Sequence, residues 1–415
     1  MKRLRAGILL MLSMSVMAQA AEHQRWSEKT ANDWYAKQPW LVGVNYIPAD
    51  AINQLEMWQA DSFDPKRIDL ELGWAVGLGM NTMRVFLHDL LWQQDSAGFQ
   101  KRIDTFLSVA AKHKIRPLFV LFDSCWDPFP RLGMRRAPRL GVHNSGWVQN
   151  PGAAALKDPA QYSSLEAYVK GIVGAFAHDP RVLGWDVWNE PGNLNDSSYG
   201  KLEPANRTEQ VLGLLPRVFT WARAAGPDQP LTCGVWEEND WSPLDKLSAL
   251  GKVQLEISDV ISSHNYDVPA VFEEHLKSLL GYHRPILCTE YMARGNGSTF
   301  QGILPIAKKH KVAAINWGFV AGKTQTYLPW DSWEHPYTER HPKVWFHEIF
   351  RTDGTPYRSE EVKFIREMTG QTADSTAGRW RLQSGDPRCA VSEMTPQMTS
   401  TVRPFRAGSR PQTVG

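Results

Sequence analysis

The sequence predicts an α/β protein built as a single (β/α)8 TIM barrel, with a long loop after its third strand. Two observations lead to this prediction. Short, near-continuous apolar runs rich in β-branched and aromatic residues recur along the chain, as in parallel strands buried on both faces. Segments with helical spacing separate them, and eight strands alternating with helices are typical of this barrel.

Eight strands are expected, at residues 40–46, 81–87, 116–123, 182–190, 230–236, 259–266, 285–291 and 313–320. Helices are expected at residues 65–78, 99–112, 163–177, 208–225, 269–280 and 299–310. In the first helix, Asp64 supplies an N-cap and Pro65 suits the first turn. The longest connection, residues 124–159, follows strand three. A doubly wound open sheet is the alternative, but it would need a glycine-rich turn where the chain has Asn45-Tyr46-Ile47-Pro48.

The two ends of the chain differ from the middle. Residues 1–20 read as a secretory signal peptide, with basic Lys2, Arg3 and Arg5, an apolar stretch, and Ala18-Gln19-Ala20 as cleavage site. We therefore expect an exported protein, periplasmic or extracellular. Residues 370–415 are rich in Thr, Ser, Pro, Gln and Arg, which predicts a low-complexity, poorly ordered tail. Residues 21–369 remain as the barrel domain.

Composition narrows the possible partners. A net charge of +2 gives no reason to expect nucleic acid, and no later apolar run is long enough to span a membrane. Four cysteines in 415 residues do not form a disulfide scaffold, and buried free thiols are expected. Eighteen tryptophans are unusual, and they suggest flat apolar surfaces that serve a purpose. We expect a monomer.

Two glutamates close predicted strands. Glu190 ends strand four in Trp188-Asn189-Glu190-Pro191, and Glu290 ends strand seven. In a barrel, near-opposite strands would bring both carboxylates face to face at the carboxyl end, where such barrels carry their active sites. Two carboxyl groups on either side of a glycosidic bond are what its hydrolysis needs, and a retaining reaction places them about 5–5.5 Å apart.

On these residues the sequence resembles the retaining β-glycosidases built on (β/α)8 barrels, clan A, and most closely glycoside hydrolase family 5. The resemblance implies that Glu190 is the acid/base, that Glu290 is the nucleophile, and that residues 21–369 are catalytic. It also implies substrate contacts by Asn189, Arg84, His264, Tyr266 and Trp317. Many members carry a histidine just after strand three, where this chain has Asp123-Ser124-Cys125-Trp126; His88 or His143 are candidates for that role.

General physical chemistry supports the same roles for the glutamates, the arginine and the indoles. A glutamate in a partly desolvated cleft beside a second carboxylate has a raised pKa, which suits Glu190 as an acid. A guanidinium keeps the other carboxylate ionised, which suits Arg84 beside Glu290. Indole faces stack on sugar rings, and Trp126 and Trp147 in the long loop are candidate platforms.

Other residues compete for these roles. Glu237 and Glu238 follow strand five and are rival carboxylates, whereas Asp186 inside strand four is expected to be a buried, paired acid. The cysteines match no zinc pattern and no His-x-His ends strand one, so neither a metal nor a cofactor is expected.

The sequence thus favours a retaining hydrolase of β-linked poly- or oligosaccharides, an endo- or exo-β-glycanase such as a mannanase, glucanase or xylanase. The alternative is a carbohydrate-binding protein on an inactive scaffold, which would be expected to lack one of the two carboxylates. A phosphate-using barrel enzyme is a third hypothesis, because Gly295-Asn296-Gly297 and Gly322-Lys323 follow strands seven and eight.

Overall fold

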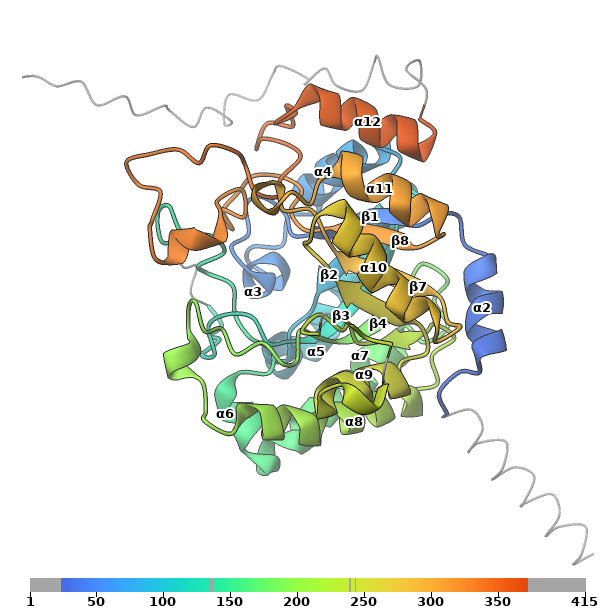
Figure 1. Cartoon of the computed structure of the whole chain (residues 1–415). Helices are drawn as coiled ribbons and strands as arrows, with labels where there is room; N and C mark the ends of the chain where they lie inside the picture. Colours follow the sequence, from blue (N-terminus) through green and yellow to red (C-terminus); the bar gives the residue numbers. More distant parts are fainter. Residues whose placement is uncertain (1–23, 134–136, 239, 243, 372–415) are drawn as a thin grey trace, which may run out of the picture. The chain divides into compact units, whose positions relative to one another are not determined.

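A computed structural model describes residues 24–133, 137–238, 240–242 and 244–371. The predicted signal peptide lies outside the described residues, as does the predicted tail from residue 372 onward. Among the described residues, eight strands form one parallel sheet in the order β5-β4-β3-β2-β1-β8-β7-β6 (Figure 1). The first strand lies beside the last, and a bridge from Val235, after β5, to Ser263 of β6 joins the two edges, so the sheet curls into a barrel, as predicted. The open-sheet alternative is wrong.

The strands lie within the predicted segments: β1 Val42–Tyr46, β2 Thr82–Phe86, β3 Arg116–Asp123, β4 Gly184–Asn189, β5 Leu231–Thr232, β6 Ile261–His264, β7 Ile286–Glu290 and β8 Ala313–Asn316. The helices that were expected are α4 Pro65–Gly77, α5 Asp89–Lys112, α7 Tyr162–Ala175, α8 Arg207–Ala224, α10 Pro269–Leu280 and α11 Phe300–Lys309. Helix α5 starts ten residues earlier than expected, because two helical stretches meet at the non-helical Asp95 (φ −160°).

Further helices were not anticipated, because most are short and are set by packing rather than by long periodic patterns. They are α2 Glu28–Ala36, α3 Gln54–Trp58, α6 Ala153–Lys157, α9 Ala249–Ile257 and α12 Ser359–Thr369, with 3-10 turns η1 Pro159–Gln161, η2 Gly200–Leu202, η3 Leu244–Lys246, η4 Arg294–Asn296 and η5 Trp330–Trp333. Asp64 caps α4 by accepting from the amides of Lys66 and Arg67, as its sequence predicted.

The seam between β5 and β6 closes the barrel through isolated hydrogen bonds. The amide of Val235 donates to the Ser262 carbonyl, and the amide of His264 donates to the Val235 carbonyl, both at 3.0 Å. The register shifts between Ser263 and His264. Strand five is therefore two residues long instead of the seven expected, yet its continuation still brings the chain up to the carboxyl end of the barrel.

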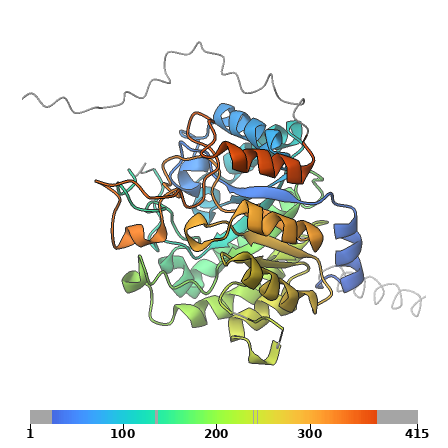
Figure 2. The same ribbon diagram turned by 45° about the horizontal axis from the view of Figure 1, so that its top comes forward.

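The amino-terminal end of the barrel is covered by α2 (Figure 2). Ala31 of this helix is fully buried, with Trp34 and Tyr35 beside it, against a cluster of residues from the strand starts: Leu41, Leu118, Leu183, Val260, Leu287, Ala313 and Ile315. The opposite, carboxyl end carries the long connections. Residues 124–152 separate β3 from α6, as the long loop after strand three predicted. Within the described ranges, every helix is too short or too polar to cross a bilayer.

Candidate active site

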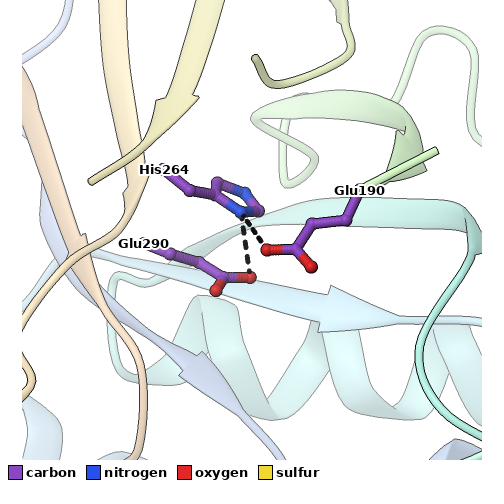
Figure 3. A group of neighbouring side chains, drawn as sticks. All are labelled: Glu190, His264 and Glu290. Atoms are coloured by element: carbon purple, nitrogen blue, oxygen red, sulfur yellow. Dashed lines mark hydrogen bonds and ion pairs between the residues drawn. The ribbon is translucent and has the colours of Figure 1, made fainter. Parts of the chain in front are cut away.

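The two predicted glutamates face each other at the carboxyl end of the barrel. Glu290 is the last residue of β7, and Glu190 follows the last residue of β4. Glu190 has a left-handed φ of 44°, which non-glycine residues seldom adopt, so the chain turns sharply at this strand end. One oxygen of each carboxylate and a ring nitrogen of His264 lie within 4.8 Å of one another (Figure 3).

Both oxygens of Glu290 accept hydrogen bonds. Arg84 Nη1 donates to Oε1 at 2.9 Å, and the Tyr266 hydroxyl donates to Oε2 at 2.6 Å. These contacts come from different strands, β2 and the end of β6. Glu290 is thus held in one orientation, with a cation on one oxygen and a hydroxyl on the other.

Arg84 is itself fixed by a buried network. Its side chain is fully buried, and Nε and Nη2 donate to Asp186 Oδ2 at 2.9 and 2.7 Å. It also donates to Asn45 Oδ1 at 2.9 Å and to Asn189 Oδ1 at 2.7 Å. The prediction of Asp186 as a buried, paired acid is confirmed. Burial acts to lower the pKa of the Arg84 guanidinium. The negative charges of Asp186 and Glu290 outweigh this effect, so the pKa is raised above its usual value.

Glu190 has a different set of neighbours. His264 Nδ1 lies 2.9 Å from Glu190 Oε1 and 3.6 Å from Glu290 Oε1, so one imidazole touches both carboxylates (Figure 3). Asn193 Nδ2 donates to Glu190 Oε2 at 2.7 Å, and the Cys125 thiol donates to the same oxygen at 3.3 Å. Arg84 therefore touches Glu290, while an imidazole, an amide and a thiol hold Glu190.

The pKa directions differ from the expectation. Burial acts to raise the pKa of Glu190, but the hydrogen bond and charge of His264 and the amide of Asn193 outweigh it and lower the pKa. Burial is the largest influence on Glu290 and, with the nearby charge of Glu190, raises its pKa. The expected raised pKa of Glu190 is therefore wrong for this structure, because His264 lies closer to Glu190 than to Glu290.

Cys125, two residues after the end of β3, contacts Glu190, and neither His88 nor His143 contacts either glutamate by a hydrogen bond. His88 caps α5, where its Nδ1 accepts from the amide of Leu90. His143 lines the pocket, but its Nδ1 is 2.8 Å from the Leu328 carbonyl. Burial raises the pKa of the Cys125 thiol well above its usual value, so it is a hydrogen-bond donor rather than a thiolate.

A pocket of about 800 Å³ surrounds the glutamates. Its aromatic lining includes Trp126, Trp236, Trp317, Trp330 and Trp333. Trp317 follows β8 and packs edge-on against Phe86 with ring centroids 6.0 Å apart. This concentration of indoles at one end of the barrel gives many of the eighteen tryptophans a shared location.

Trp147 borders the pocket but presents almost no surface to it. The residue is 2% exposed, and its indole N–H donates to Asp123 Oδ2 at 2.6 Å. Asp123 Oδ1 in turn accepts from Asn189 Nδ2 at 2.8 Å. The nearly covered ring of Trp147 thus packs in the loop and orients the Asp123–Asn189 pair, and its role as a sugar platform stays a prediction.

Sequence reasoning missed Asn193 and the contact made by Cys125. Asn193 lies three residues after Glu190 in the turn that follows β4, so its proximity was the one available signal. Of the two other candidate carboxylates, Glu238 accepts a hydrogen bond from Ser248 Oγ at 2.7 Å, which gives it a structural contact. Glu237 is exposed at the pocket rim. Cys125, Cys233 and Cys288 are buried and free, as expected, and Cys389 lies outside the described residues.

Glu190, His264 and Glu290 are also the one group among the described residues with ligand atoms close enough to hold a metal ion. Arg84 already places a guanidinium 2.9 Å from Glu290 Oε1. A metal cation at this point would lie beside a permanent positive charge, which disfavours it. The three residues are therefore better suited to act as a pair of carboxylates bridged by an imidazole than to bind a metal ion.

Comparisons with known proteins find solved structures with the same barrel fold. A GH5_18 protein from Streptomyces cattleya, solved in complex with GlcNAc, superimposes with a TM-score of 0.51 at 16% identity, over 84% of this chain and 82% of that one. An exo-β-1,4-mannosidase from Opitutaceae bacterium strain TAV5 gives 0.52 at 18% identity, over 80% and 60%. The chain thus shares the (β/α)8 barrel fold of these two structures.

Similarity in sequence to curated proteins is more limited. A protein of Aspergillus flavus named probable mannan endo-1,4-beta-mannosidase F is 23% identical over 217 residues. The match covers 48% of this chain, and the chain spans less than half, 43%, of that relative. No protein-family model matches the chain. The structural likeness thus shows the fold, and the roles of individual residues stay predictions.

Proposed function

We propose that the protein is a retaining O-glycosyl hydrolase that cleaves β-linked saccharides, with Glu290 as nucleophile and Glu190 as acid/base. One observation carries the proposal: two carboxylates with oxygens within 4.8 Å face each other inside an aromatic pocket. That separation fits a retaining pair, whereas an inverting pair needs about 6.5–9.5 Å to admit a water molecule.

In the first step, one oxygen of Glu290 attacks the anomeric carbon while the bond to the leaving oxygen breaks. Glu190 gives its proton to that oxygen, and a glycosyl ester forms on Glu290. Arg84 and Tyr266 hold the attacking carboxylate in place and favour its ionised form. In the second step, Glu190 takes a proton from water, which attacks the anomeric carbon and releases Glu290.

The proton must be on Glu190 when the glycoside binds. A sugar ring that excludes water from Glu190 raises the pKa of its carboxyl relative to the structure described above. Ester formation then removes the charge of Glu290, so the pKa of Glu190 falls and it becomes a base for the second step. Asn193, Cys125 and His264 hold Glu190 throughout by their hydrogen bonds.

β-1,4-Mannosides are the first substrate class to test. The support is that the Aspergillus flavus relative and the Opitutaceae structure are named as β-mannosidases, at low identity. β-Glucans and xylans are the other members of the proposed range. Export through the predicted signal peptide, to the periplasm or outside the cell, belongs to the same proposal.

The test uses purified full-length protein with aryl β-mannosides, β-glucosides and β-xylosides. Glu290→Ala is expected to abolish turnover, because no second group can form the ester. Glu190→Ala is expected to lose about 10²–10⁴-fold on poor leaving groups. It should keep more activity on good leaving groups, and azide should restore activity. Glu209→Ala, an exposed site on α8, is the matched control and should behave as wild type.

The stereochemistry of the product provides an independent readout. Proton NMR of the first product should show the β anomer. Wild-type turnover in Glu290→Ala, or release of the α anomer, would contradict the proposal. Sugar binding by calorimetry without any cleavage would instead favour the carbohydrate-binding alternative.

A further inference from the structure

Two segments at the carboxyl end of the barrel lock together along one side of the pocket. They are the β3 loop, residues 124–133 and 137–152, and the β8 segment, residues 317–358. Figures 1 and 2 show them side by side, in teal-green and orange. Hydrogen bonds join them at several points: His143 N to Ser332 Oγ, Asn144 N to the Thr324 carbonyl, Tyr337 N to the Gly141 carbonyl, and Gln325 Nε2 to the Arg139 and Val142 carbonyls.

The closest approach leaves no room between the two backbones. Gly141 has a φ of 75°, and a Cβ built there would lie 2.6–2.7 Å from backbone atoms of Tyr337. Glycine is required at such a position both for its conformation and for space. The β3 loop and the β8 segment therefore form one continuous wall, which we call the closed wall.

Aromatic rings fill the inner face of the closed wall. Trp126 from the β3 loop stacks on Trp333 from the β8 segment, with centroids 5.8 Å apart and an angle of 29°. The guanidinium of Arg139 covers Trp333 at 5.2 Å. Trp330 packs edge-on against Tyr266 with centroids 5.1 Å apart. Trp126, Trp330 and Trp333 all line the pocket, so the closed wall bounds the pocket on this side.

The position of the closed wall follows from the strand order. β3 and β8 flank β2 and β1, so a loop from β3 that meets the β8 segment passes on the β1–β2 side. Glu237 follows β5, which lies across the barrel from β1. Glu237 is exposed and packs close to Gly192, two residues after Glu190, and both residues line the pocket. We call this side of the pocket, where its lining reaches the exposed Glu237, the open side.

This inference rests on the proposed function. Under that function, the closed wall and the open side determine which way a bound saccharide runs through the pocket. The group that Glu190 protonates is the leaving oxygen, so the leaving part of the saccharide extends toward Gly192 and Glu237 on the open side. The sugar that bonds to Glu290 then points toward Trp317 and the closed wall. A saccharide chain cannot continue through the closed wall beyond that sugar.

We propose that the enzyme is exo-acting and removes sugars from the non-reducing end of short β-linked chains. The closed wall admits little beyond the terminal sugar, and the open side accepts the remainder of the chain. Burial lowers the pKa of His143 in this wall to about 4, so the imidazole is neutral at neutral pH and suits an uncharged sugar. The β3 loop and the β8 segment thus determine the cleavage pattern.

The experiment uses the full-length protein and β-1,4-mannotetraose to mannohexaose labelled with a fluorophore at the reducing end, with matching gluco- and xylo-oligosaccharides. Exo action releases unlabelled monosaccharide and labelled products shortened by one sugar at a time. Labelled products that are several sugars shorter, formed from the first turnover, would overturn the proposal. So would a rapid fall in the viscosity of the corresponding polysaccharide.

Variants connect the cleavage pattern to the closed wall. Trp333→Ala removes the ring that stacks on Trp126, and we expect a rise of at least tenfold in the ratio of disaccharide to monosaccharide released. Gln325→Ala removes three hydrogen bonds between the two segments and is expected to act in the same direction. Leu140→Ala, in the same loop at a 72% exposed residue, is the matched control and should keep the wild-type pattern.

The outcomes separate this inference from the function on which it rests. Random internal cleavage that depends on Glu290 would overturn exo action and leave the glycosidase intact. Absence of cleavage of every oligosaccharide and aryl glycoside would overturn both. An unchanged product ratio in folded Trp333→Ala and Gln325→Ala would overturn the assignment of the closed wall.

Discussion

The hydroxyl of Tyr266 offers a direct test of how Glu290 is kept ready to react. It donates to Glu290 Oε2 at 2.6 Å in a buried setting, and this hydrogen bond lowers the pKa of the carboxyl against the effect of burial. Tyr266→Phe removes the hydroxyl and little else. A nucleophile must be ionised, so the pKa of Glu290 sets the acidic limb of the activity profile.

The magnitude follows from the kind of bond. A hydrogen bond to a charged group contributes about 1.5–3 kcal/mol. At about 1.4 kcal/mol for each factor of ten, its loss makes the ionised form about 10- to 150-fold less favourable relative to the protonated form. We therefore expect kcat/KM of Tyr266→Phe to fall by about that factor on the acidic side. The acidic limb moves to higher pH, because removing a donor to the carboxylate raises the pKa of Glu290.

The assay is kcat/KM on an aryl β-glycoside across the pH range in which the protein stays folded. Tyr35→Phe is the matched control, since its hydroxyl donates to the Lys311 carbonyl at 2.8 Å, at the amino-terminal end of the barrel. It should leave the profile unchanged. An acidic limb in Tyr266→Phe that coincides with the wild-type limb would refute the proposed role of the hydroxyl.

His264→Gln removes the strongest influence that lowers the pKa of Glu190, so the basic limb of kcat/KM should move to higher pH; a limb at lower pH would contradict this. Phe106→Ala deletes a fully buried ring that packs on Trp58, and the free energy of unfolding in urea should fall by about 3–5 kcal/mol. Burial raises the pKa of Glu348 to about 7. A raised folded pKa means that stability is lost as pH rises from about 4.5 to 7, so Glu348→Gln should gain on the order of 3 kcal/mol relative to wild type across that interval, as measured by urea unfolding at each pH.

The barrel and the placement of its main polar groups could be predicted because each depends on a strand. Apolar runs located all eight strands, and the ends of strands four and seven located Glu190 and Glu290. The family resemblance implied that Arg84 of β2 contacts Glu290, and its Nη1 lies 2.9 Å from Glu290 Oε1. Parallel strands in a closed barrel leave little freedom in where such residues point.

What could not be predicted depends on loops and on small differences in distance. The contact of Cys125 with Glu190 is made by a turn after β3 whose path no periodicity fixes. The pKa directions of the two glutamates depend on His264 lying 2.9 Å from one and 3.6 Å from the other, which a residue pattern does not encode. The burial of Trp147 could not be predicted either, because a position in a loop says nothing about how deeply the ring lies.

Under the proposed function, a pocket with one closed end imposes an order on the reaction. The terminal sugar is bonded to Glu290 beside Trp317 of the closed wall after the first step, so the shortened chain departs first and the terminal sugar last. A polysaccharide cannot thread through for a second cut, and each cleavage requires a new encounter. The proposed exo action therefore predicts distributive cleavage, with the monosaccharide product as a competitive inhibitor.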